Sequence, residues 1–122
     1  MDNIELRQIT WIGSSLNDLK SLPKSVQKEF GFSLHQVQEG KTPYNAKHLK
    51  GLGSGIIEII SDYNKNTYRA IYAVKLGDDI YVLHVFKKKS KTGIKTPQQD
   101  ISLIEKRLIF AKEDAKKRAK LI

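Results

Sequence analysis

The spacing of hydrophobic positions divides the chain into segments with strand-like and helix-like periodicity. The first segment, residues 4–12, alternates imperfectly between polar and apolar side chains and predicts a short strand. After a Gly-Ser-Ser break, residues 15–39 carry apolar positions at three- and four-residue spacing. Within them, Pro23 suits the first turn of a helix, and Gly40 is a typical helix end. We expect a helical hairpin over residues 15–39, with a short helix followed by a longer one.

The middle of the sequence is rich in strand-forming residues. Residues 41–55 contain one proline and three glycines, and this punctuation predicts a loop. β-Branched and aromatic side chains then recur in three runs, at residues 56–62, 67–76 and 80–88, with turn residues between them. Because the connections are short, we expect these runs to form an antiparallel meander.

The last segment has the pattern of a long amphipathic helix. The sequence Thr-Pro-Gln-Gln at residues 96–99 combines a capping box with proline at the first helical position. A stripe of apolar residues follows at helical spacing, and the helix is expected over residues 97–116. The complete order of elements predicts an α+β fold, in which a small antiparallel or mixed sheet carries its helices on one face.

The composition narrows the class of protein. The chain has no cysteine, which excludes disulfides, thiolate nucleophiles and cysteine-based zinc sites. It contains no apolar run of the length that a membrane span requires, and its first residues lack the features of a signal peptide. With 122 residues, we expect one soluble cytoplasmic domain over residues 1–122, with no membrane partner.

Charge is distributed unevenly along the chain. The formal net charge is +9, of which residues 1–83 contribute +1 and residues 84–122 contribute +8. A localised basic region attracts polyanions, namely nucleic acid, an anionic membrane or an acidic protein. A solvated basic helix that only aids solubility is equally compatible with this distribution.

Metal and nucleotide chemistry find little support in the sequence. His35, His48 and His84 are far apart and lack the spacing of a known ligand motif, so we expect no metal. The glycine-rich residues 51–55 lack a Gly-Lys-Ser/Thr ending and precede a strand, unlike a P-loop or a dinucleotide fingerprint. Basic residues instead gather before, within and after the predicted sheet. They are Lys47, Lys50, Arg69, Lys87, Lys88, Lys89 and Lys91.

Arg69 is the unusual member of this group because it lies inside a predicted strand. It either faces solvent or pairs with a carboxylate such as Glu58 or Asp62. Strand alternation also decides its basic neighbours: a hairpin loop of two or four residues places it with His84 and Lys88, and a three-residue loop places it with Lys87 and Lys89. A sheet face with converging cations and nearby tyrosines suits an RNA phosphate and a stacked base.

A series of short motifs, in a defined order and spacing, resembles a known family. The motifs are WIGSS at residues 11–15, NAKHLKG at 45–51, IEI at 57–59, YRAIY at 68–72, VLHVFKKKS at 82–90 and Thr96-Pro97. Together they resemble the RelE/ParE superfamily of bacterial type II toxins, in particular its phage-derived, HigB-like branch. The resemblance implies a RelE-like fold and a toxin that forms a hetero-oligomer with a cognate antitoxin. It also implies an activity, since many relatives cleave mRNA on the ribosome, whereas the ParE side poisons DNA gyrase.

RNA cleavage of this kind needs no metal and no cofactor. The 2′-OH attacks the adjacent phosphorus, so the protein must supply a base, an acid and cations for the transition state. We assign transition-state stabilisation to Arg69, whose guanidinium suits phosphate oxygens. Lys88 and Lys89 hold the scissile phosphate, and one of them protonates the leaving 5′-oxygen. Lys50, or alternatively Lys47, serves as the base.

The remaining candidates have two interpretations each. His84 is either an alternative base or a supporting core residue, and Tyr72 either stacks on a base or fills the core. Lys47, Lys87 and Lys91 are expected to contact RNA. The basic face of the last helix is expected to meet ribosomal RNA or an acidic segment of the antitoxin. Two other functions remain open, a gyrase poison without nuclease activity and an inactive nucleic-acid-binding module.

Overall fold

The computed structural model describes residues 5–88 and 96–121. Its elements, in chain order, are β1 (Ile9–Trp11), α1 (Ser15–Lys20), α2 (Lys24–Gln38), β2 (Ala46–His48), β3 (Ile56–Tyr63), β4 (Asn66–Ala73), β5 (Ile80–Lys87) and α3 (Gln98–Ala119). The five strands form one sheet in the order β1-β5-β4-β3-β2. β1 is parallel to β5 and the other neighbours are antiparallel. The predicted α+β fold with a mixed sheet and a C-terminal helix is confirmed.

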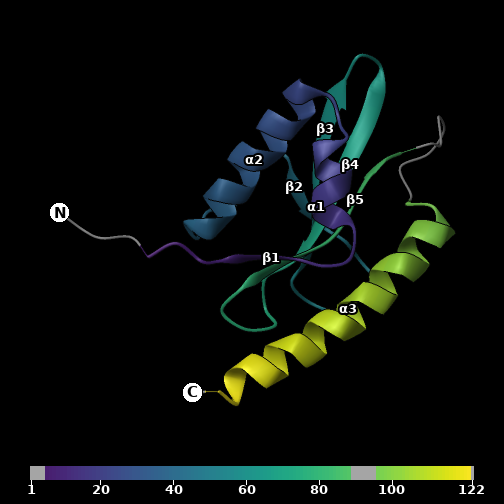
Figure 1. Ribbon diagram of the computed structural model, residues 1–122. Coiled ribbons are helices and arrows are strands. Elements are labelled where there is room, and N and C mark those ends of the chain that lie inside the picture. Colours follow the sequence, from purple (N-terminus) through teal and green to yellow (C-terminus); the bar gives the residue numbers. More distant parts are fainter. Residues whose placement is uncertain (1–4, 89–95, 122) are drawn as a thin grey trace.

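The helices lie on both faces of the sheet, so the expectation that they share one face is wrong. Figure 1 shows α2 on one side of the strands and the long α3 on the other. The reason lies in β5, where every residue from Ile80 to Val85 is buried and both faces therefore need cover. On β4, Tyr72 packs in the cluster that contains α2, and Ile71 packs in the cluster that contains α3.

Each long helix contributes one apolar stripe to its side of the core. The buried apolar residues of α2 are Val26, Phe30, Leu34 and Val37, and those of α3 are Ile104, Leu108, Ala111 and Ala115. These stripes follow the three- and four-residue spacing that predicted the helices. Within residues 5–88 and 96–121, no helix is long and apolar enough to cross a membrane.

Three local predictions need correction. The first strand is limited to Ile9–Trp11, and its predicted start at residue 4 lies outside the described residues. The predicted loop over residues 41–55 contains β2, which is only three residues long and pairs with β3. The capping box at residues 96–99 does not form, because Pro97 occupies the N-cap position of α3 and no side chain caps it.

A β-bulge between β4 and β5 decides which side chains share a face. Tyr72 is paired with Val82, but the next pair is Ile71 with His84, so Leu83 is the extra residue. After the bulge Arg69 lies opposite Phe86. Because side chains alternate, residues 84 and 88 then lie on the face of Arg69, together with α3. The structure therefore follows the register that combines Arg69 with His84 and Lys88.

Candidate anion-binding site

A buried glutamate lies at the centre of the basic residues. Glu58, on β3, is only 1% exposed. Its Oε2 accepts a hydrogen bond from Nη1 of Arg69 at 2.9 Å, and its Oε1 lies 3.4 Å from Nζ of Lys47. Lys47 is the direct partner of Glu58 across β2 and β3, whereas Arg69 reaches it from β4, where Ile71 is the direct partner. One carboxylate therefore holds two cations in place from two neighbouring strands.

Lys88 adds a third positive charge to this cluster. Desolvation lowers the pKa of Lys88, and so do the positive charges of Arg69 and Lys47, whereas Glu58 acts in the opposite direction. The position of Lys88 is fixed by its backbone N–H, which donates to the carbonyl of Thr67 at 2.8 Å. Among the residues that the structure describes, three cations lie around one carboxylate, so this part of the cluster has a surplus of positive charge that favours an anion.

The cluster opens into a pocket of about 540 Å³. The pocket is lined by Lys47, His48, Leu49, Lys50, Glu58, Arg69, Thr96 and Ile101. Lys50 is exposed at its rim, whereas Arg69 is 4% exposed and lies deep within it. Nη1 of Arg69 also donates to the hydroxyl of Thr96 at 3.3 Å, just before α3. The pocket thus lies between the β2 edge of the sheet and the start of α3.

His84 is held from both sides by α3. Its Nε2 is 2.7 Å from Oδ1 of Asp100, its Nδ1 is 3.5 Å from Nη1 of Arg107, and its ring stacks on Phe86 with centroids 4.5 Å apart. Arg107 also donates to the carbonyl of Leu83 at 2.9 Å. With both ring nitrogens engaged and 7% exposure, His84 fastens α3 to β5. These contacts match a supporting role better than that of a base.

Not all of the expected site residues lie together. Tyr72 is 1% exposed on the face of α2, where burial raises its pKa to about 12. Of its two interpretations, the structure shows the core residue. Lys87 is exposed on that same face, away from Arg69. Lys89 and Lys91 lie outside the described residues. The pocket therefore combines Arg69 with Lys47 and Lys50, and Lys88 lies within electrostatic range of Arg69.

The structure confirms the pair of Arg69 with Glu58, one of the two carboxylates that the sequence offers as its partner, and Glu58 stands out as a charge between isoleucines. Sequence reasoning left two other structural partners out of the site. Thr96, which the sequence predicts as a helix cap, contacts Arg69 instead. Asp100 gave no signal, because its contact with His84 depends on how α3 crosses the sheet.

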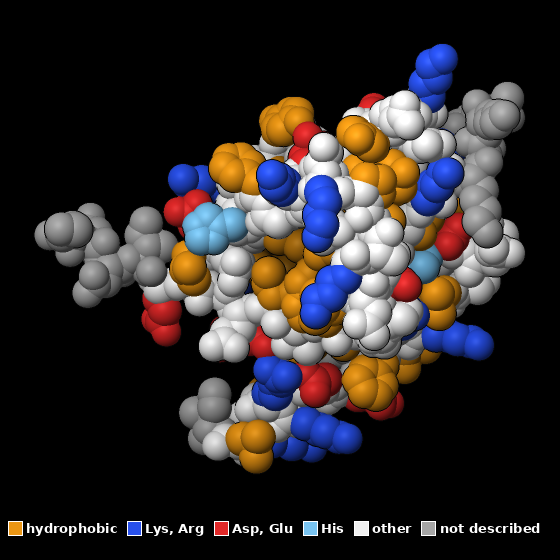
Figure 2. All heavy atoms as spheres, turned by 45° about the horizontal axis from the view of Figure 1, so that its top comes forward, with side chains coloured by type: hydrophobic (Ala, Val, Ile, Leu, Met, Phe, Trp, Pro, Cys, Tyr) orange, Lys and Arg blue, Asp and Glu red, His pale blue; other side chains and the backbone are white. Residues whose placement is uncertain are grey.

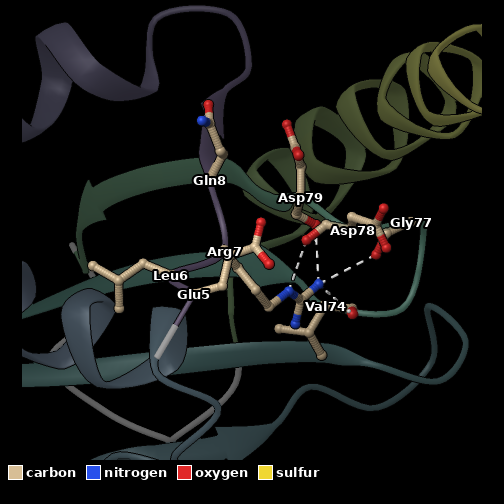
Figure 3. A pocket seen from close by; sticks show the side chains of 8 residues that line it. All are labelled: Glu5, Leu6, Arg7, Gln8, Val74, Gly77, Asp78 and Asp79. Atoms are coloured by element: carbon tan, nitrogen blue, oxygen red, sulfur yellow. Dashed lines mark hydrogen bonds between the residues drawn. The ribbon is translucent and has the colours of Figure 1, made fainter. Parts of the chain in front are cut away.

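A second polar cluster lies at the other end of α3. Arg118 forms ion pairs with Asp79 and with Asp114, and Asp114 accepts a hydrogen bond from the hydroxyl of Tyr81 at 2.8 Å. Burial and Asp114 together raise the pKa of Tyr81 to about 12. Nearby, the guanidinium of Arg7 donates to four carbonyls of residues 74–79 (Figure 3). This cluster ties the turn after β4 to the chain before β1 and to α3.

The outer face of α3 carries much of the basic charge of the last third of the chain. Figure 2 shows lysine and arginine side chains around the C-terminal end of this helix. The exposed basic residues there are Lys112, Lys116, Lys117, Arg118 and Lys120. Within the described residues, no group of three or more histidine, aspartate or glutamate side chains is arranged to hold a metal ion.

The fold and the site together define a small α+β protein with a basic pocket at one edge of a mixed sheet. Residues 17–109 match the family described as Phage derived protein Gp49-like (DUF891), and since the match covers more than half of the chain, the chain belongs to this family. The family is associated with toxins of toxin–antitoxin systems, which suggests an antitoxin as a partner. The comparison with curated proteins found no match, and neither did the comparison with solved structures.

Proposed function

We propose that the chain, as one domain over residues 1–122, is the toxin of a type II toxin–antitoxin system and a ribosome-dependent mRNA endoribonuclease of the HigB-like branch of the RelE/ParE superfamily. The observation that carries the proposal is the surplus of positive charge around Arg69 in an open pocket. A pocket of this charge suits a phosphodiester better than a neutral metabolite. The cognate antitoxin, the ribosome and mRNA are its proposed partners.

The proposed reaction is an internal transesterification of RNA. The 2′-oxygen forms a bond to the adjacent phosphorus while the bond to the 5′-oxygen breaks. The products are a 2′,3′-cyclic phosphate and a free 5′-hydroxyl. One proton leaves the 2′-OH and one is delivered to the 5′-oxygen, so the protein supplies a base and an acid and no other reagent is consumed.

The positions of the basic residues suggest how they divide this work. Arg69 presents its guanidinium to the phosphate oxygens, where it stabilises the transition state. Glu58 keeps that guanidinium in place. Lys88 is the proposed acid, because its lowered pKa lets it release a proton more readily than an ordinary lysine does. Lys50 at the pocket rim is the proposed base.

The other proposed RNA contacts extend this site. Lys47 contacts RNA at the rim, and Lys89 holds the scissile phosphate together with Lys88. Lys87 and Lys91 contact flanking phosphates, and the lysines on the outer face of α3, namely Lys112, Lys116, Lys117 and Lys120, meet ribosomal RNA. If these contacts form, affinity for ribosomes falls steeply as salt rises from 50 to 200 mM, because each phosphate contact releases counterions. A flat salt response would count against them.

The first experiment maps 5′ ends of mRNA in a purified translation reaction, with and without ribosomes. Wild type is expected to give new in-frame cuts that require ribosomes. Arg69→Lys keeps the charge beside Glu58 but loses the planar fork, and we expect a loss of about 10²–10³-fold in cleavage rate. Arg118→Lys is the matched control at the other end of α3 and should cut like wild type. Intact mRNA with wild-type protein would overturn the proposal, and gyrase supercoiling and RNA-binding assays would then follow.

A further inference from the structure

A second hollow, of about 480 Å³, lies next to the basic pocket at the same edge of the sheet. It is lined by Glu29, Tyr44, Asn45, Ala46, Lys47, Ile60 and Asp62. Lys47 lines both hollows. A ligand with two adjacent parts of different chemistry could therefore occupy both.

The register of the strands fixes how close the second hollow is to Arg69. Ile60, which lines the hollow, is the direct cross-strand partner of Arg69. Glu58, Ile60 and Asp62 alternate along β3 and therefore share one face with Arg69. The hollow therefore begins on the face of the basic pocket, at Ile60 and Asp62, and extends around the β2 edge of the sheet to Glu29 on α2, which covers the opposite face.

The chemistry of the second hollow differs from that of the basic pocket. Tyr44 is 83% exposed, more than any other aromatic side chain in the described part of the chain. Its hydroxyl lies 3.4 Å from Oε2 of Glu29, which links the ring to α2. The carboxylates of Glu29 and Asp62 repel a phosphate, but they accept hydrogen bonds from N–H groups. An exposed ring, an apolar floor at Ile60 and two carboxylates suit a flat, uncharged group that carries amino groups.

We infer that the second hollow is the subsite for a nucleobase next to the scissile phosphate, with Tyr44 as its stacking surface. The inference rests on the proposed function, since it needs an RNA phosphate beside Arg69. Stacking on tyrosine accepts every base. The two carboxylates add a preference for adenine, cytosine or guanine, whose amino groups donate, over uracil. Tyr44 thereby takes the role that sequence reasoning offered to the buried Tyr72.

The test measures cleavage rates on ribosomes programmed with defined mRNAs. Tyr44→Ala is expected to lower the rate roughly 5- to 150-fold, the equivalent of one base–aromatic stack, and Tyr44→Phe should retain most of the activity. Phe110→Ala is the matched control, because Phe110 is 62% exposed on α3 and lines neither hollow. The same proteins are then tested on mRNAs with an abasic residue on either side of the cut.

The abasic mRNAs separate stacking from a structural effect. Wild type should cut one of them more slowly than the intact mRNA. Tyr44→Ala should cut that abasic mRNA at nearly the same rate as the intact one. Equal rates for Tyr44→Ala and Phe110→Ala would overturn the inference, as would a loss that is the same with and without the base. If wild type cuts no mRNA, the proposed function itself fails and the subsite fails with it. If wild type and Tyr44→Ala both cut mRNA at the same rate, the proposed function stands and only the subsite fails.

Discussion

The two ends of α3 each meet a cluster of arginine and carboxylate side chains, but the two clusters differ in burial and in charge balance. Near its start, Arg69 is 4% exposed and shares the carboxylate of Glu58 with Lys47, while Lys88 lies close by. Near its end, the side chain of Arg118 is 50% exposed and has two carboxylates, those of Asp79 and Asp114.

This difference distinguishes a cluster that can bind a ligand from one that only stabilises the fold. At the C-terminal end two carboxylates bind Arg118, and the hydroxyls of Thr10 and Tyr81 donate to the same carboxylate oxygens. The charged groups of this cluster therefore have their partners among its own residues. At the N-terminal end, within residues 5–88 and 96–121, cations outnumber the carboxylate beside an open pocket. The surplus of charge, more than the presence of an arginine, distinguishes the region that can bind an anion.

The largest effect on stability is expected at Glu58. Glu58→Gln keeps the shape but removes the buried carboxylate that pairs with Arg69, which should lower the free energy of unfolding by about 3–5 kcal/mol. Chemical denaturation of the purified variant measures this loss. Added sulfate should restore part of it, since the surplus cations then have an anion to bind.

The double variant Glu58→Gln, Arg69→Met is the control for that result. It removes both charges and should recover part of the stability, because a neutral buried pair avoids the cost of burying one charge after its ion pair is broken. If Glu58→Gln costs no more than a change at the exposed Arg118, the contrast between the two clusters is wrong.

An intermediate effect is expected at Lys88. Its folded pKa lies below the ordinary value of 10.5, so the unfolded chain binds more protons between the two values and stability rises with pH across that interval. Below both values the charge opposes folding. Lys88→Met should therefore raise Tm slightly at neutral pH. It should also abolish the increase of stability with pH, while the cleavage rate falls about 10²–10⁴-fold.

Thermal unfolding from neutral pH to above pH 10.5 checks the stability of the Lys88 variant. Lys87→Met is the matched control, since Lys87 is exposed on the opposite face of β5 and should change neither Tm nor its pH dependence. A lower Tm for Lys88→Met at neutral pH would contradict the electrostatic argument.

The smallest effect is expected at Arg118. Arg118→Ala removes two ion pairs of a half-exposed side chain, and such pairs contribute about 0–1 kcal/mol. The urea midpoint should shift little, and mRNA cleavage should equal that of wild type. A large loss of cleavage would mean that the C-terminal cluster takes part in function after all.

Elements with strong local signals were predictable from the sequence. The runs that became β3, β4 and β5 and the long stripe of α3 were placed within a few residues, because local periodicity sets them. The three-residue β2 was missed, since its strand character comes from pairing with β3. The placement of helices on both faces was missed for a related reason. The sequence of β5 is a continuous apolar run, which does not indicate which helix covers which face.

Part of the site could be predicted for a similar reason. Alternation limited the neighbours of Arg69 to two sets, and the extra residue Leu83 selected the set with His84 and Lys88. A bulge has no reliable signal in one sequence, so both sets stayed open. The exposure of Tyr44 and the burial of Tyr72 likewise depend on how α2 packs on the sheet.

The parallel pairing of β1 with β5 has a consequence for the order in which the chain is made. Ile9 pairs with Ile80, about 70 residues later, so β1 has no partner until β5 has been synthesised. Closing so long a loop is slow compared with forming local contacts. Arg69 and Lys88 also meet only once β5 is complete. The pocket is therefore incomplete during most of synthesis. It forms only after most of the protein has emerged from the ribosome.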